Sequence, residues 1–221
     1  GSARLVGDVD STGTHDRGGM SHAETILRAL DRRLAQPVHL VLYGRAALAL
    51  GFQPPLPVAE ISMDVDVILP LAQSAELETA PHFWSALTAV NRELEPQGLF
   101  LTHLFDETQV ILRPCWLDHL EPILLPGLVE LRLSRPAAID LLLTKMMRGL
   151  DPEDMAESAF LIQAGRVDAT VIRAATPPRH SGNTGRFSRC TAAHYAPARK
   201  HAMTILRRVA TPSPGSIIGS L

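Results

Sequence analysis

Two aspartates separated by a single residue, Asp64 and Asp66, are the feature that most restricts how this chain can fold. They lie in the apolar segment 63–69, whose composition predicts a β-strand. Because strand side chains alternate between the two faces of a sheet, both carboxylates point to the same face. A buried pair of like charges would cost several kcal/mol or stay partly protonated. That face is therefore predicted to be wet or to hold a metal ion.

The residues before this strand predict a second strand and a glycine turn. Residues 38–43 are almost wholly apolar, which is typical of a buried strand. Gly44 supplies a permissive turn into a short alanine-rich helix over 45–50. The proline-rich stretch 53–57 is predicted to be irregular. On the strand 63–69 the valines are predicted to face the core, opposite the aspartates.

Composition indicates a globular protein. Hydrophobic residues make up 46% of the 221 residues, enough to fill a sizeable core. No apolar run approaches the roughly 18 residues needed to span a bilayer, and the N-terminus lacks the layout of a signal peptide. The two cysteines, Cys115 and Cys190, lie far apart, which fits a reducing compartment. We therefore expect a cytoplasmic protein without a membrane partner.

Charge is distributed unevenly along the chain. The formal net charge is only −2, but no acidic residue follows Asp168, whereas seven basic residues lie in 176–221. An acidic body with a basic tail is the result. The predicted organisation is an expression leader or disordered segment over 1–19, a core over 20–133, a C-terminal helical part over 134–175, and a tail over 176–221 that is flexible or holds one helix.

The remaining patterns predict an α+β fold, a small mixed sheet flanked by helices. Ser21 and Glu24 have the spacing of a capping box, and Ser134, Asp151 and Asp168 are typical helix N-caps. Helices are predicted over 21–35, 81–94, 137–149, 152–165, after 168, and over 197–210. Further strands are predicted over 99–104 and 109–112, paired as a hairpin, and over 128–133.

The first of these motifs resemble the nucleotidyltransferases of the DNA polymerase β-like superfamily. Gly44 follows an apolar strand, and the Asp64-x-Asp66 pair on the next strand is preceded two residues earlier by the hydroxyl of Ser62. These motifs alone are a weak signal, and they become moderately specific when the later helical signature follows them in the chain. The resemblance implies a nucleotidyltransferase-like sheet flanked by helices.

A later run resembles the helical signature of the minimal and abortive-infection (AbiEii-type) toxin branch of that superfamily. It comprises Asp140 to Lys145, then Arg148, then Asp151 to Glu157. With the first motifs, the similarity covers roughly 38–162. It implies a bacterial enzyme, with a toxin–antitoxin pair as one setting.

The resemblance implies transfer of a nucleotidyl group from an NTP, assisted by Mg²⁺ or Mn²⁺. Asp64 and Asp66 would be the catalytic carboxylates and the metal ligands. The nucleotide would be bound at Gly44, Arg45, Ser62, Lys145 and Arg148. The acceptor stays open among RNA, protein and small molecules such as antibiotics, and an antitoxin is a further possible partner. A catalytically inactive nucleotide-binding or protein-interaction module on the same fold is the alternative.

The sequence departs from the family pattern at two places. Arg45 stands where the family has glycine or serine, so its guanidinium either blocks close phosphate approach or replaces a backbone contact. The strand predicted over 109–112 lacks the third carboxylate, and only Asp106 and Glu107 at its start are acidic. The general base is therefore unassigned. His39 and His103 are predicted to be structural.

Overall fold

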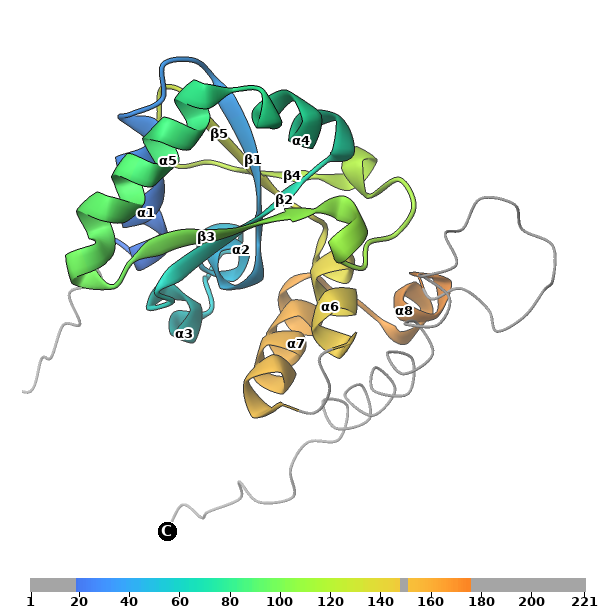
Figure 1. Cartoon of the computed structure of the whole chain (residues 1–221). Helices are drawn as coiled ribbons and strands as arrows, with labels where there is room; N and C mark the ends of the chain where they lie inside the picture. Colours follow the sequence, from blue (N-terminus) through green and yellow to red (C-terminus); the bar gives the residue numbers. More distant parts are fainter. Residues whose placement is uncertain (1–18, 148–150, 176–221) are drawn as a thin grey trace, which may run out of the picture.

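A mixed five-stranded sheet organises the residues that the computed structural model describes, 19–147 and 151–175 (Figure 1). The strands are β1 (Val38–Tyr43), β2 (Asp64–Leu69), β3 (Phe100–Asp106), β4 (Glu121–Ile123) and β5 (Leu131–Arg135), in the order β3-β2-β1-β5-β4. β1 pairs antiparallel with β2 and parallel with β5; β2 and β3 are parallel, and β4 and β5 are antiparallel. The predicted α+β class is confirmed.

Helices flank this sheet. They are α1 (His22–Asp31), α2 (Gly44–Leu50), α3 (Pro57–Glu60), α4 (Leu71–Glu78), α5 (Pro81–Leu94), α6 (Ala138–Met147), α7 (Pro152–Ala164) and α8 (Ala169–Ala175), with 3₁₀ turns η1 (Glu95–Gln97), η2 (Glu107–Gln109) and η3 (Trp116–His119). α1 and α5 lie together, whereas α6 and α7 pack against each other beyond α2 (Figure 1). No helix within the described ranges is long and apolar enough to cross a membrane.

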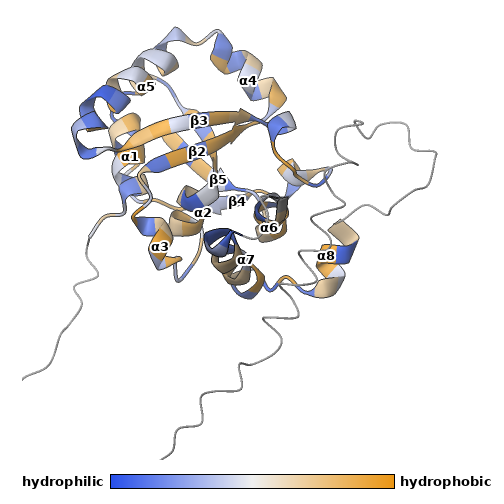
Figure 2. Cartoon of the chain, turned by 60° about the horizontal axis from the view of Figure 1, so that its bottom comes forward, coloured by the Kyte–Doolittle hydropathy of each residue, from blue (hydrophilic) through white to orange (hydrophobic). Residues whose placement is uncertain are grey.

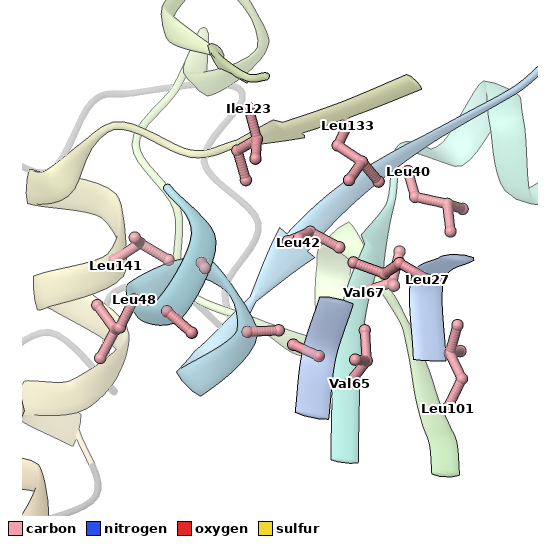
Figure 3. Close-up of a cluster of buried hydrophobic side chains, with 14 of the residues drawn as sticks. Leu27, Leu40, Leu42, Leu48, Val65, Val67, Leu101, Ile123, Leu133 and Leu141 are labelled. Carbon is pink, nitrogen blue, oxygen red and sulfur yellow. The ribbon is translucent and has the colours of Figure 1, made fainter. Parts of the chain in front are cut away.

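Alternation along β2 separates the core from the site. Val65 and Val67 are fully buried and join side chains of α1, β1 and β3 in the main apolar cluster, as Figure 3 shows. Asp64 and Asp66 point to the other face and are partly exposed. A shift of register by one residue would turn both carboxylates into the core and both valines out of it. The observed register is favoured because it buries the apolar side chains, which contributes roughly 25 cal/mol per Å².

Several predicted elements are confirmed. Ser21, Asp151 and Asp168 each accept a hydrogen bond from a backbone N–H of the helix that they precede. The helix predicted over 81–94 is α5, in which Trp84 is 39% exposed and donates a hydrogen bond to the Leu77 carbonyl. Glu24 pairs with Arg28 instead of completing a capping box, and α1 ends at Asp31, before the predicted end.

The predicted hairpin over 99–112 is wrong. β3 extends from 100 to 106 and runs parallel to β2, and no strand forms over 109–112. Asp106 accepts from the Thr108 N–H and starts the 3₁₀ turn η2, which ends the extended chain. A parallel pairing requires a long crossover, and α4 and α5 supply it. The helices α3 and α4 and the strand β4 were not predicted.

Two boundaries around the helical part also differ from expectation. The strand predicted over 128–133 is β5, which begins at Leu131 and continues to Arg135, and α6 begins at Ala138. Ser134, expected as a helix cap, lies in β5 and contacts His39, with its Oγ 2.8 Å from His39 Nε2. Arg148, residues 1–18 and the basic tail over 176–221, with its predicted helix, lie outside the described residues.

A buried ion pair fixes the start of α6. The Asp140 carboxylate is fully buried and accepts three hydrogen bonds from Arg113, from the backbone N–H, Nε and one terminal nitrogen, at 2.8–3.0 Å. Bidentate pairing of this kind gives geometric specificity as well as energy. Asp140 therefore positions α6, the helix that carries Lys145. This is the structural role of Asp140 in the motif from Asp140 to Lys145.

We predict that Asp140→Ala lowers the free energy of unfolding by about 3 kcal/mol, because it leaves the Arg113 guanidinium without its buried partner. Chemical denaturation measures this change. Asp118→Ala, which removes an exposed carboxylate from η3, is the control and should stay within about 0.5 kcal/mol of the parent. Equal stability of the two variants would contradict the proposed positioning role.

Candidate active site

A polar pocket of about 420 Å³ lies where β1 ends and β2 begins. It is lined by residues of four segments: Gly44, Arg45, Ser62, Asp64, Asp66, Lys145, Asp151, Glu153 and Asp154. Six of these were singled out from the sequence as site residues, and they come from positions 44 to 145. The antiparallel pairing of β1 with β2 brings the glycine turn to the aspartates, because Tyr43 lies opposite Asp66.

The Asp64 and Asp66 carboxylates lie on the same side of β2. Ser62 is buried and its hydroxyl donates a hydrogen bond to Asp64 Oδ1 at 2.9 Å. This contact orients one carboxylate oxygen and leaves the other for a ligand. The serine predicted as a nucleotide contact thus acts on Asp64 in this structure.

Gly44 permits a close approach between the turn and Asp66. Its φ is +59°, in the left-handed region that favours glycine. A Cβ built at this position would lie 3.1 Å from Asp66 Oδ2. The glycine therefore serves both the backbone turn and the space around the carboxylate.

His103 of β3 completes a cluster with the two aspartates that was not expected from the sequence. Its Nδ1 lies 2.9 Å from Asp66 Oδ1. Asp64, Asp66 and His103 each offer one ligand atom, and these atoms lie within 4.8 Å of one another. Asp106 and Glu107, the two acidic residues considered for a third carboxylate, do not line the pocket. Asp106 lies opposite Leu69, at the far end of β2 from Asp64.

Arg45 and Lys145 converge on one buried carboxylate of α7. Glu157 is 1% exposed, and its Oε1 accepts from Arg45 Nε at 2.8 Å. Lys145 Nζ lies in ion-pair range of Glu157 Oε2, without the geometry of a hydrogen bond, and donates to Asp154 Oδ1 at 3.0 Å. Glu153 pairs with Arg45 from the solvent side. Figure 2 shows α2 close to α7, with hydrophilic residues on both.

These contacts define the electrostatics of the pocket. The hydrogen bond to Glu157 is the main reason why the pKa of Arg45 is raised, so its guanidinium stays charged. Two cationic side chains line the pocket, against five acidic ones. An anionic ligand without a counter-ion would therefore meet net repulsion.

His39 has no place in the pocket, as predicted. Burial and the neighbouring Arg132 charge lower its pKa, which favours the neutral ring beside Ser134. Arg148, which was expected to contact phosphate, lies outside the described residues.

Comparison with known proteins gives no match: no family model, no curated protein and no solved structure is similar to this chain.

We predict that Glu157→Gln lowers the free energy of unfolding by about 3 kcal/mol, because the buried Lys145 and the partly exposed Arg45 both lose the counter-charge of a buried carboxylate. Glu153→Gln is the matched control: this residue also pairs with Arg45, but its side chain is 73% exposed. Its effect should be about 0.5 kcal/mol. Thermal and urea unfolding of both variants measure the difference, and similar losses would contradict a special role for Glu157.

We predict that Gly44→Ala costs about 1–2 kcal/mol of stability, because the left-handed backbone is strained with a Cβ, and also weakens divalent-ion binding at Asp66. Gly127→Ala is the control, since Gly127 has a φ of +89° and lies outside the pocket. It should lose comparable stability and keep ion binding. Thermal unfolding with and without Mn²⁺ separates the two effects; unchanged ion binding in Gly44→Ala would contradict the role of the close approach.

Proposed function

We propose that this protein is a nucleotidyltransferase that moves a nucleotidyl group from an NTP to an acceptor and requires Mg²⁺ or Mn²⁺. The observation that carries the proposal is the shared pocket: Asp64 and Asp66, the Gly44 turn and Lys145 meet there. Nothing in the spacing of these positions along the chain requires them to meet. Their convergence supports the function that the resemblance implies.

The donor set fits a divalent cation. Carboxylate oxygens are ligands that Mg²⁺ and Mn²⁺ prefer, and Ser62 holds one of them in place. When bound, the ion neutralises phosphate charge and polarises the phosphorus centre. Asp64 and Asp66 would hold the ion at the start of β2, beside the Gly44 turn.

The charge of the pocket supports a requirement for a metal ion. Asp154 and Glu157 already neutralise Lys145, and Glu153 and Glu157 neutralise Arg45. A triphosphate therefore gains little attraction from these side chains alone, and it meets the carboxylates of β2. A divalent cation between the carboxylates and the phosphates would be coordinated by oxygens of both and would so remove that repulsion. In this arrangement Arg45 occupies the wall between the turn and α7, where it limits the space for the phosphates.

The acceptor belongs to one of three classes: RNA, protein or a small molecule. As a toxin of a toxin–antitoxin pair, the enzyme would arrest growth through such a transfer, and the antitoxin would suppress it. Replacing the metal-binding aspartates then removes the growth arrest together with the transfer.

Calorimetric titration with each NTP, combined with a labelled-NTP transfer assay on bacterial extract, tests the proposal. We expect NTP binding only with Mg²⁺ or Mn²⁺, loss of binding in EDTA, and labelling of one acceptor class. The doubly substituted variant Asp64→Asn with Asp66→Asn should lose at least about 100-fold in transfer, because the metal contributes several kcal/mol to the barrier.

Glu76→Gln with Glu78→Gln provides the matched control, since it also removes two carboxylates, from exposed positions on α4. It should retain full binding and transfer. Metal-dependent NTP binding without transfer to any fraction of the extract would contradict the proposed transfer activity and favour the inactive nucleotide-binding module. Absence of NTP binding under every metal condition would overturn both.

A further inference from the structure

An irregularity in the pairing of β2 with β3 turns His103 toward the aspartates. Val65 lies opposite Leu101 and Asp66 opposite His103, so Thr102 is an extra residue on β3. With regular alternation, His103 would share the buried face of Leu101. The bulge instead leaves His103 on the side of Asp66, with its side chain 58% exposed. Bulges next to active sites commonly redirect a side chain in this way.

Neighbouring side chains hold the His103 ring in place. Its plane stacks on Phe105 with ring centroids 5.3 Å apart and 12° between the planes. Thr102 Oγ1 lies 2.9 Å from the same Nδ1 that contacts Asp66. Phe105 in turn packs edge-on against Tyr43, the residue before the glycine turn. Contacts with Phe105, Thr102 and Asp66 therefore fix the orientation of the exposed His103 ring.

We propose that His103 is the third protein ligand of the metal ion held by Asp64 and Asp66, and that it makes the site selective for a first-row transition-metal dication over Mg²⁺. Ligands on opposite sides of one ion with bonds of about 2.1 Å lie about 4.2 Å apart. The three donor atoms already lie within 4.8 Å of one another, so small side-chain rotations bring them to one ion.

The choice of metal follows from the donor types. Mg²⁺ is bound by oxygen and keeps several waters, whereas imidazole favours Mn²⁺, Co²⁺ and Zn²⁺ in increasing order of affinity. A site of two carboxylates and one imidazole therefore discriminates against Mg²⁺ more strongly than three carboxylates do. Mn²⁺ combines affinity for imidazole with affinity for phosphate oxygen. This inference rests on the metal site of the proposed function and decides between its two candidate ions.

Titration of the full chain with Mn²⁺ alone and Mg²⁺ alone, without nucleotide, tests the inference. His103→Ala should weaken Mn²⁺ binding at least about tenfold, since even an outer-shell partner of a metal ligand is worth that much. His103→Asp should keep ion binding but reduce the preference for Mn²⁺ over Mg²⁺ by at least about tenfold. His82→Ala on α5 replaces an exposed histidine outside the cluster and should change neither value.

Pulsed electron paramagnetic resonance of the Mn²⁺ complex supplies a second readout that a merely orienting histidine would not move. The wild-type complex should show coupling to an imidazole nitrogen, and both His103 variants should lack it. Unchanged Mn²⁺ affinity in His103→Ala, or a wild-type complex without nitrogen coupling, would overturn the inference.

The outcomes separate this inference from the proposed function. If nitrogen coupling is observed but the protein transfers no nucleotidyl group to any acceptor, the ligand role of His103 is supported and the proposed enzymatic activity is contradicted. If Mg²⁺ supports transfer but the Mn²⁺ complex lacks nitrogen coupling, the ligand role of His103 is contradicted and the proposed enzymatic activity is supported.

Discussion

The geometry of the pocket depends on the Glu157 carboxylate. It contacts Arg45 of α2 and Lys145 of α6 from its position on α7, so three helices meet at one buried charge. Such a charge is costly to bury unless its partners stay in place. Because Arg45 directly follows the Gly44 turn, the same contact fixes the helical part against the end of β1. The pocket wall opposite Asp64 and Asp66 is therefore set by this buried charge together with the apolar packing of α2, α6 and α7 in the main cluster.

Local rules were sufficient to predict one half of this site. The period-two pattern of 63–69 places both aspartates on one face, and the valines between and after them bury the other face. The Gly44 turn follows from glycine chemistry, and its φ of +59° agrees with that reasoning. Helix caps at Asp151 and Asp168 follow from short-range hydrogen bonding. Each of these features depends on residues within a few positions of one another.

The other half depends on contacts between distant segments, which the sequence pattern does not encode. The parallel pairing of β3 with β2 follows from the crossover through α4 and α5, and a hairpin was expected instead. His103 reaches Asp66 only because one extra residue at Thr102 interrupts the alternation. The partners of Arg45 lie more than 100 positions further along the chain, on α7. A bulge and a long-range ion pair have no local signature that distinguishes them from ordinary strand and surface residues.

The two departures from the pattern that the sequence resembles are connected through charge. Arg45 adds a cation beside the turn, but the carboxylates of α7 neutralise it, and they neutralise Lys145 as well. In the proposed metal site, His103 takes the place of a third carboxylate, which leaves one negative charge fewer next to Asp66. Under the proposed function, an NTP would meet a pocket whose cations are already paired and whose proposed metal ligands carry less negative charge than three carboxylates. More of the positive charge of a bound dication would then remain available to the phosphates, so the ion rather than Lys145 and Arg45 would supply most of the attraction.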